Sequence, residues 1–528
     1  MGLLQDVAGP AAQHFDKLGT ASQVAVVFVG FIVLSVILNV LNQIFNKNPN
    51  EPPVVFHWLP FIGSTVIYGM DPPTFFKENS EKYGDVFTFI LLGKKTTVYV
   101  GPHGNEFILN GKQKDVNAEE IYNKLTGPVF GKDVVYDCPN AKLMEQKRLI
   151  KNVLTTEAFR SYVPIICDEV TSYFKSNPDF KGQSGIVNIP TKMAQLTIFT
   201  AAHTLQGKAV REQFDESLAD LYHDLDMGFT PINFMLNWAP LPQNARRDRA
   251  QRTVAKLYMD TIKVRRQREE SDAQDIMHHL MTSTYKDGTV IPDHEIAHML
   301  IALLMAGQHS SSSTSSWIMC RLASRPDIME ELYQEQVREL GGIDKPLEYE
   351  DLAKLKLNTN VIRETLRMHA PIHSIMRAVK SPMPVPGTKY VIPTSHTLLA
   401  APGVSGNDPA YFPEPELWEP HRWEAGNPLG PTQPVKNEDE EEKIDYGYGM
   451  VSKGASSPYL PFGAGRHRCI GEQFAYLQLQ TIVANITRLF KFRNVDGSTG
   501  KTVGTDYASL FSRPLEPANI YWERRVKA

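Results

Sequence analysis

The sequence predicts a mainly α fold with a small β part (α+β), preceded by one membrane-spanning helix. Three observations predict this. The pattern from about Asn105 to Arg338 is mainly helical. Two shorter stretches, Phe87–Val100 and Met383–Ala401, indicate strands interrupted by glycine or proline. An uncharged apolar run from Val24 to Leu41 is about the minimum length that crosses a bilayer.

Composition describes an ordinary globular protein with few cysteines. The chain has 528 residues, 42% hydrophobic and 22% charged residues, and a formal net charge of −4. This charge gives no indication of nucleic-acid binding, and we expect no nucleic-acid partner. The four cysteines are too few for a disulfide framework and fit a reducing compartment.

The N-terminal run predicts a transmembrane anchor at residues 23–45, after a short lumenal segment at residues 1–22. A signal peptide is disfavoured because the apolar run is long, Asp6 and Asp16 precede it, and no small-residue cleavage site follows. A buried core helix is the alternative. With Lys47 after the run, we expect the large domain on the cytosolic side.

Residues 46–62 form a proline-rich connector, which is semi-rigid and fixes the distance between the domain and the membrane. Its apolar part, Val54–Leu59, either dips into the membrane interface or packs on the domain. We expect residues 63–528 to form one domain. The acidic run Glu438–Glu442 indicates a solvated surface insertion.

Within this domain, Phe87–Val100 predicts a hairpin around Gly93. The longest helix is expected from Asp293 to about Leu322, and its apolar middle places it in the centre of the fold. Pro326 marks its end. Ile520–Trp522 indicates a terminal strand.

The most informative stretch is the loop Phe462–Gly471, which places Cys469 beside three basic side chains and just before an amphipathic helix at roughly Gln473–Phe490. Nearby cations and a helix N-terminus lower a cysteine pKa, so we expect a thiolate. The glycines allow a flat ligand to approach closely, and arginine and histidine can bind acidic groups on its rim. An iron porphyrin requires both features. The alternative is a structural cysteine in a basic loop.

The middle of the long helix has an unusual composition, because Ala306–Ser310 is followed by six serines and threonines. Serine hydroxyls bond to carbonyls four residues back and bend helices, and Gly307 removes a side chain. We therefore expect a local opening, with His309 and Ser310 facing an apolar cavity. Histidine can relay protons there, and serine can hold a water. The alternative is a serine-rich helix that packs closely on its neighbours.

The pattern Phe-x-x-Gly-x-Arg-x-Cys-x-Gly resembles the haem-thiolate loop of the cytochromes P-450. Two other regions narrow the resemblance: Tyr122 and Tyr136 around Phe130-Gly131-Lys132 with Lys147 beyond, and the segment Pro371–Arg377. They look like the substrate-recognition and haem-clasping segments of sterol 14α-demethylases, especially the fungal ones. The resemblance runs from about Pro53 to the C-terminus and includes the segment Phe229–Phe234.

The resemblance implies a triangular haem-thiolate monooxygenase domain that holds haem b (heme b, iron protoporphyrin IX). Cys469 would be the axial iron ligand, shielded from water by Phe462, with His309, Ser310 and Gly307 serving oxygen chemistry. The other residues implied to contact haem are Tyr122, Tyr136, Lys147, Arg377, His467, Arg466 and Gly463. Those implied to line a sterol cavity are Phe130, Tyr136, Phe229, Met305, His373, Ser374, Met376 and Leu510.

A Glu-Arg pair is expected to have a structural role. Glu364 and Arg367 are three residues apart on one predicted helix, so they share a face. The segment Trp418–Trp423 resembles the superfamily segment whose arginine joins this pair. We therefore expect Glu364, Arg367 and Arg422 to form a buried network behind the cysteine loop.

The implied activity is sterol 14α-demethylation in ergosterol biosynthesis, with lanosterol or eburicol as substrate. Three successive oxidations would use O2 and electrons from an NADPH-dependent reductase that docks near Lys147, Arg148, Arg466 and Arg468 at the endoplasmic reticulum membrane. Azole nitrogens would bind the open iron position. Close relatives often have threonine where this chain has Ser310, so we expect altered water geometry. Two alternatives remain: a monooxygenase of the same superfamily with another substrate, and a non-catalytic haem-binding membrane protein.

Overall fold

The structure is a computed structural model, and it describes residues 18–214, 216–230, 232–233, 237–268, 275–433, 435 and 442–525. Residues 1–17 of the predicted lumenal segment and most of the acidic run lie outside this part. The helices are α2 Thr20–Phe45, α3 Thr65–Met70, α4 Pro72–Tyr83, α5 Gly101–Leu109, α6 Glu119–Phe130, α7 Asn140–Lys151, α8 Thr156–Ser176, α9 Ile189–Ala201, α10 Lys208–Arg211, α11 Glu216–Asp226, α13 Pro242–Arg268, α14 Ile276–Thr282, α15 Asp293–Ser324, α16 Pro326–Leu340, α17 Tyr349–Leu352, α18 Lys356–Met368, α19 Pro402–Gly406 and α20 Glu472–Leu489. The strands are β1 Val86–Leu91, β2 Lys94–Tyr99, β3 Val116–Asn117, β4 Ser184–Asn188, β5 Ile375–Val379, β6 Met383–Pro384, β7 Val391–Ile392, β8 Thr397–Ala400, β9 Lys443–Asp445, β10 Met450–Ser452, β11 Phe490–Asn494, β12 Thr505–Asp506, β13 Arg513–Pro514 and β14 Asn519–Arg524.

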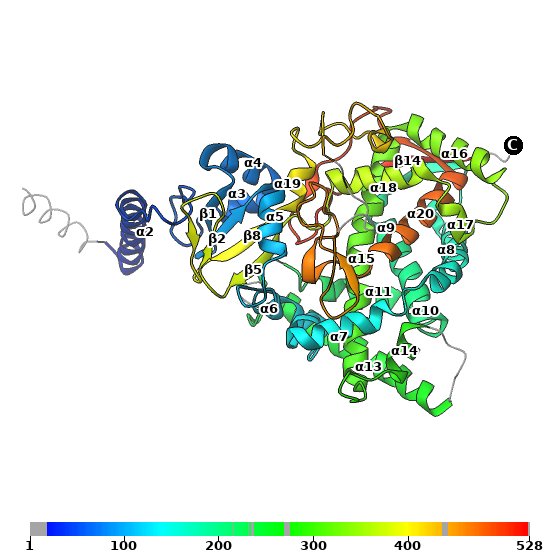
Figure 1. Cartoon of the computed structure of the whole chain (residues 1–528), viewed down its shortest axis with the longest axis horizontal. Helices are drawn as coiled ribbons and strands as arrows, with labels where there is room; N and C mark the ends of the chain where they lie inside the picture. Colours follow the sequence, from blue (N-terminus) through cyan, green and yellow to red (C-terminus); the bar gives the residue numbers. More distant parts are fainter. Residues whose placement is uncertain are drawn as a thin grey trace, which may run out of the picture.

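A five-stranded sheet in the order β1-β2-β8-β5-β3 lies at the end of the domain nearest α2 (Figure 1). The predicted hairpin is confirmed: β1 and β2 pair antiparallel and are joined by Leu92 and Gly93. Both turn residues have positive φ, which matches the twist of a two-residue hairpin turn. The predicted terminal strand is also present as β14, which pairs with β11 and β4.

The helical part of the fold is built around α15, which lies among the other helices in Figure 1. Its 32 residues make it the longest described helix, most of them are buried, and α16 begins at Pro326. The prediction of a central helix is therefore confirmed. The expected local opening is not found, because α15 is continuous from end to end. Hydroxyls in its middle bond to carbonyls of the same helix instead: Ser310 Oγ donates to the Ala306 carbonyl (2.9 Å) and Thr314 Oγ1 to the Ser310 carbonyl (2.8 Å), whereas Ser313 Oγ donates to the Ser512 carbonyl.

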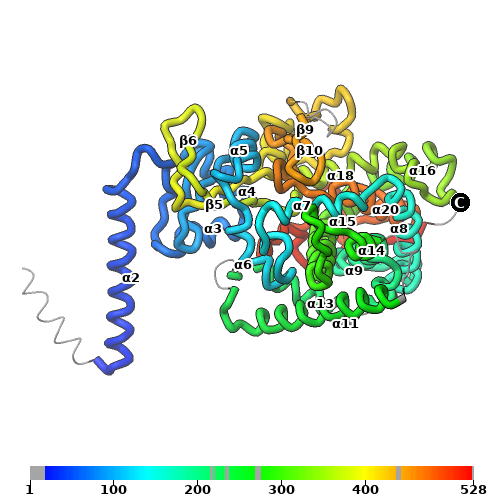
Figure 2. The backbone as a smooth tube through the Cα atoms, turned by 60° about the horizontal axis from the view of Figure 1, so that its bottom comes forward, coloured from blue at the N-terminus to red at the C-terminus, as the bar shows by residue number. Residues whose placement is uncertain are grey.

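The N-terminal helix α2 stands beside the domain without entering its core (Figure 2). Its 26 residues have a mean hydropathy of 2.9 in the most apolar window, so α2 is long and apolar enough to cross a membrane. The alternative of a buried core helix is wrong, because no residue of α2 is buried.

Two polar side chains of α2 are hydrogen-bonded to the connector. Asn39 Nδ2 and Gln43 Nε2 donate to the His57 carbonyl (2.9 and 2.7 Å), and the His57 amide donates to Gln43 Oε1 (3.1 Å). The connector both packs and protrudes: His57 is buried, whereas Phe56 is 44% and Trp58 is 65% exposed. Packing on the domain is therefore confirmed for His57, and insertion of the exposed rings into the membrane interface stays a prediction.

We predict that replacing Asn39 and Gln43 by leucine releases the connector but leaves α2 intact. Leucine is apolar and favours helices, but it cannot bond to His57. The His57 amide should then exchange with deuterium about tenfold faster, which corresponds to the loss of roughly one hydrogen bond. Asn42→Leu is the matched control, because the Asn42 side chain bonds to Asn46. Equal exchange of the His57 amide in both variants would contradict the prediction.

Candidate active site

The cysteine loop closes on itself just before α20. The Cys469 amide donates to the Phe462 carbonyl (3.1 Å), and α20 begins three residues after Cys469. Gly463 and Gly465 have φ of +68° and +67°, a region that side chains disfavour. At Gly465 space is also decisive, because a Cβ would lie 2.3 Å from the Leu109 carbonyl oxygen. The loop therefore requires these glycines for its shape.

The thiol of Cys469 is exposed, and yet burial raises its pKa. Both observations hold if the thiol faces a space enclosed by protein. The expectation of a lowered pKa is wrong for the protein alone: desolvation is the largest effect and raises the pKa, and the charges of Lys147 and Arg468 offset it only in part. A metal ion bound to Cys469 would lower the pKa of this thiol again, because coordination deprotonates a thiol.

A second open surface lies in the middle of α15. Ala306 is exposed although most of this helix is buried. A Cβ added to Gly307 would meet no atom of the described residues within 4 Å. α15 packs against α20, the helix that begins three residues after Cys469, so the exposed Ala306 and the exposed Cys469 lie on neighbouring parts of the fold.

Positively charged side chains lie close to the cysteine loop. Lys147 Nζ donates to the Arg466 and Arg468 carbonyls (3.0 Å each), and burial lowers its pKa to about 7. Arg377 is 3% exposed and donates to the Met376 carbonyl. In the described part of the chain, no carboxylate forms an ion pair with Lys147, Arg377 or His467. The positive charges of Lys147 and Arg377, which no carboxylate neutralises there, fit an anionic ligand such as a haem propionate.

Burial, and then the charges of Arg377, Lys147 and Arg466, lower the pKa of His467 well below its ordinary value. An anion bound nearby would raise it again. Arg466 donates to Asn140 Oδ1 (3.3 Å) and lies over the Tyr446 ring. The cysteine loop thus places two further side chains, those of Arg466 and His467, near the charges of Lys147 and Arg377.

Two tyrosines complete this region. The rings of Tyr122 and Tyr136 stack with their centroids 5.2 Å apart, and the Tyr136 ring lies 5.9 Å from the His467 ring. The Met376 amide donates to Tyr122 Oη (2.9 Å). Burial raises the pKa of Tyr136 to about 12, so its hydroxyl stays neutral and able to donate.

His309 projects from α15 into an aromatic cluster. Its ring stacks on Phe511 (centroids 5.2 Å apart) and meets the edge of Phe229, which in turn contacts Phe130. His309 Nε2 lies 3.3 Å from Asp226 Oδ1 on α11. Burial lowers the pKa of His309, and the charge of Asp226 opposes this shift. The cluster is therefore apolar, with one titratable pair at its edge.

The segment before β5 forms a small hydrogen-bonded group. Ser374 Oγ lies 2.8 Å from His373 Nδ1 and accepts a bond from Tyr68 Oη (2.9 Å). Burial lowers the pKa of His373 to about 4, so the ring is neutral. The remaining residues expected around a sterol are differently placed: Met305 is completely buried, whereas Met376 and Leu510 are half-buried.

Glu364, Arg367 and Arg422 come together in a buried network. Glu364 Oε1 accepts from Arg367 Nη2 and from Arg422 Nε, both at 2.8 Å, and none of the three is more than 1% exposed. Arg367 Nε also donates to Glu364 Oε2 (3.0 Å), and other guanidinium nitrogens donate to main-chain carbonyls, including that of Gly406 (2.7 Å). Because removing one partner would leave a buried charge unpaired, this network fixes α18 against the segment that carries Arg422.

Similarity to known proteins shows the family of this chain. A family model described as cytochrome P450 matches residues 52–517. This chain belongs to the cytochrome P450 family. A sterol 14-alpha demethylase of Gibberella zeae is 73% identical, over 99% of this chain and 100% of that protein. An eburicol 14-alpha-demethylase of Uncinula necator is 62% identical, over 97% and 98%.

A solved structure extends the comparison to the fold. A retinoic acid-bound cyanobacterial P450 has a TM-score of 0.74 and 20% identity, and the match covers 91% of this chain and 100% of that one. At this identity the likeness shows the fold alone. It confirms the expected P450 fold, and family membership implies a haem cofactor.

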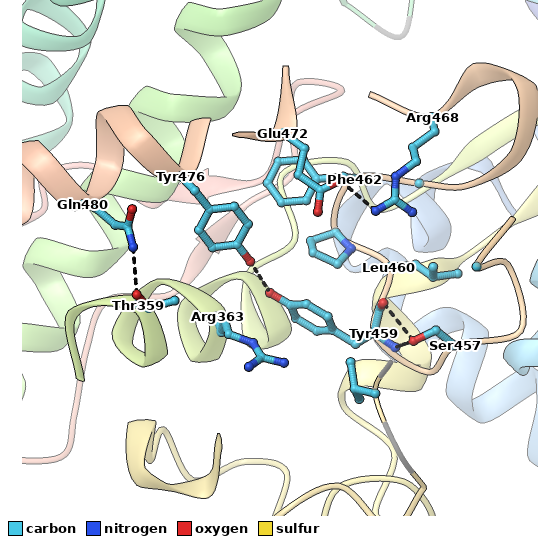
Figure 3. A pocket seen from close by; sticks show the side chains of 14 residues that line it. Thr359, Arg363, Ser457, Tyr459, Leu460, Phe462, Arg468, Glu472, Tyr476 and Gln480 are labelled. Atoms are coloured by element: carbon cyan, nitrogen blue, oxygen red, sulfur yellow. Dashed lines mark hydrogen bonds and ion pairs between the residues drawn. The ribbon is translucent and has the colours of Figure 1, made fainter. Parts of the chain in front are cut away.

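A separate cavity of about 300 Å³ borders the cysteine loop of this P450 and opens to solvent (Figure 3). Phe462, Gly463 and Arg468 line it, but Cys469 does not, so it is not the space that the thiol faces. Across it, the hydroxyls of Tyr459 and Tyr476 lie 3.2 Å apart. This contact links the segment just before the cysteine loop to α20.

Several residues of this P450 site were not expected from the sequence. Asp226 reaches His309 from another helix, Phe511 stacks on the His309 ring, and Lys147 Nζ lies 3.9 Å above the Tyr448 ring. No local pattern marks Asp226 or Tyr448, whereas Phe511 adjoins the expected Leu510. In the expected segment Phe229–Phe234, residues 231 and 234 lie outside the described part.

We predict that Gly465→Ala abolishes haem uptake by this P450, whereas Gly463→Ala weakens it modestly. Both variants force alanine into the left-handed region, at about 1–2 kcal/mol. At position 465 alone the new Cβ also meets backbone, while at 463 its nearest neighbour is Ile375 Cδ1 at 3.9 Å. The ratio of Soret to 280 nm absorbance of the purified proteins measures uptake. Equal absorbance ratios for both variants would show that the contact of the new Cβ with the backbone at position 465 does not matter for haem uptake.

We predict that His309 makes the protein less stable in acid. Because its folded pKa is depressed below 6.5, the unfolded chain binds the proton more readily. The stability it contributes is complete above pH 6.5 and is lost as pH falls through the lower folded pKa. The thermal midpoint should therefore fall less on acidification in His309→Gln, and more in Asp226→Asn, than in the parent. Identical pH dependence in all three would contradict the prediction.

Proposed function

We propose that this P450 removes the 14α-methyl group of lanosterol or eburicol. The observation that carries the proposal is the 73% identity to a sterol 14-alpha demethylase along practically the whole chain. The reaction would comprise three successive oxidations with O2 and NADPH-derived electrons, and the methyl group would leave as formate. The apolar cluster around Phe130 and Phe229 supports a rigid lipid substrate.

The residues near Cys469 would hold haem b in this proposal. The thiolate of Cys469 would be the axial ligand, and Phe462, whose carbonyl accepts the Cys469 amide, would shield it. Tyr122, Tyr136, Lys147, Arg377 and His467 would bind the propionates, with Arg466 and Gly463 shaping the loop. The absence of a carboxylate partner for Lys147 and Arg377 among the described residues supports this assignment. Bound haem supplies oxygen activation, which a thiolate ligand favours.

The chain's own task on the other side of the site would be to exclude water and move protons. Gly307 leaves room beside α15, and Ser310 Oγ could hold a water by turning away from the Ala306 carbonyl. His309 would pass protons from its Nε2, which faces Asp226. This role for the pair suits a histidine whose pKa is set by burial and by one carboxylate.

The sterol would contact residues from several elements. Tyr136, His373, Ser374 and Met376 would approach it from one side, and Phe130, Phe229 and Leu510 from another. Met305, which has no exposed surface, would have to move to touch a substrate. Azole inhibitors would occupy the same cavity, with a ring nitrogen on the iron.

We infer the location in a membrane from the apolar helix α2, and the docking surface of the electron donor from the basic residues near the cysteine loop. We place the protein in the endoplasmic reticulum membrane as a single-pass protein with its catalytic domain in the cytosol, because α2 can span a bilayer and the substrate partitions into lipid. A membrane-bound NADPH-dependent reductase would dock near Lys147, Arg148, Arg466 and Arg468.

The proposal is tested on the full-length protein with two measurements. The carbon monoxide difference spectrum of the reduced protein should show the Soret band typical of thiolate ligation, and Cys469→Ser should lose it. Reconstitution with a reductase should convert lanosterol or eburicol to the 14-desmethyl product. A normal spectrum without either product would remove the sterol assignment alone, whereas a missing band would remove the haem-thiolate site.

A further inference from the structure

The loop between α6 and α7 is strained where it presents Tyr136 to the site. Asp133 and Val135 have φ of +66° and +54°, and neither is glycine. This region is a genuine outlier for a β-branched residue such as valine. Backbone strain of this kind persists only where the surrounding structure fixes it. Because Val135 directly precedes Tyr136, whatever holds this turn also sets the direction of the Tyr136 side chain.

The side-chain amide of Gln146 holds the strained turn from both sides. The Val135 amide donates to Gln146 Oε1 (3.1 Å), and Gln146 Nε2 donates to the Asp133 carbonyl (2.9 Å). Gln146 thus offers the turn the same donor and acceptor that a neighbouring strand would offer. It is 2% exposed, so water cannot replace these bonds.

Gln146 is itself held in place. It lies on α7, one residue before Lys147, and its Nε2 also approaches Tyr285 Oη (3.4 Å). Tyr285 Oη donates to Glu295 Oε2 on α15 (2.5 Å), and Glu295 pairs with Lys142 on α7 (2.8 Å). This arrangement fixes the orientation of the amide, because the reverse orientation would set an NH2 group against the Val135 amide.

We propose that Gln146 is a positioning residue, whose amide keeps the Asp133–Val135 turn in the shape that directs Tyr136 into the site. The inference rests on the proposed function in so far as Tyr136 contacts haem and sterol. It adds a residue that touches neither group and acts through the main chain. Gln146 should therefore affect ligand binding only while Tyr136 retains its hydroxyl.

The experiment compares Gln146→Leu with the parent in the full-length, haem-loaded protein. Leucine fills similar space but makes neither bond. Two readouts are the spectral Kd of lanosterol and the deuterium exchange of the peptide covering residues 131–139. We expect Kd to rise about tenfold, as for other residues that orient a ligand-binding group, and the Val135 amide to exchange faster. In a Tyr136→Phe background the same substitution should change Kd less than about twofold.

Matched variants separate positioning from general stability. Gln336→Leu is the control, because Gln336 is also 2% exposed and bonds to Ala484 and Thr487 away from this loop. It should leave the Kd unchanged. Adding Val135→Gly to Gln146→Leu should restore the Kd, because glycine adopts positive φ without strain. Should Gln146→Leu not fold, Gln146→Glu keeps the acceptor for Val135, loses the donor to Asp133 and should raise the Kd to a smaller extent.

Two results would overturn the inference on Gln146, and a third would overturn the proposed function. An unchanged Kd in Gln146→Leu, or an equal rise in the Tyr136→Phe background, overturns the inference. A parent protein without the thiolate-type carbon monoxide band overturns the proposed function instead. In that event the exchange of the Val135 amide still tests whether Gln146 holds the turn, because this readout needs no ligand.

Discussion

Unpaired positive charge beside an internal space is the constraint on which this structure depends. Lys147 comes from α7, Arg377 from β5 and His467 from the cysteine loop, and in the described residues none of them has a carboxylate partner. Separating a charged group from water is costly, and this cost lowers the pKa of Lys147 to about 7 and keeps the pKa of His467 well below its ordinary value, so that the His467 ring is neutral until an anion lies beside it. An anionic group between them would relieve it, so in our proposal the cofactor completes the packing of three distant segments.

The surroundings of this space are rigid by different means. Behind the cysteine loop, one carboxylate satisfies two buried guanidinium groups, and this network leaves Glu364 no freedom to move alone. In front, the α6–α7 loop has an unfavourable backbone that Gln146 stabilises. Both devices bury polar groups with all their partners supplied, which is expensive to break and specifies one arrangement.

Local patterns predicted the parts of the fold that local chemistry determines. The hairpin at Gly93, the central helix ending before Pro326 and the glycine-rich loop around Cys469 each follow from neighbouring residues. The prediction of a local opening in α15 was wrong, because hydroxyls such as that of Ser310 donate to carbonyls of the same helix. The low pKa expected for Cys469 was wrong because the sequence shows its charged neighbours but not its burial. Asp226 could not be predicted, since it meets His309 only when α11 packs near α15.

The bonds from Asn39 and Gln43 to His57 have a mechanical consequence. A tether of free chain would let the domain swing independently of its anchor, whereas these bonds make the two turn together. A hydrophobic helix leans more in a thin bilayer than in a thick one. The tilt of the whole domain above the membrane would then vary with the thickness of the lipid around it.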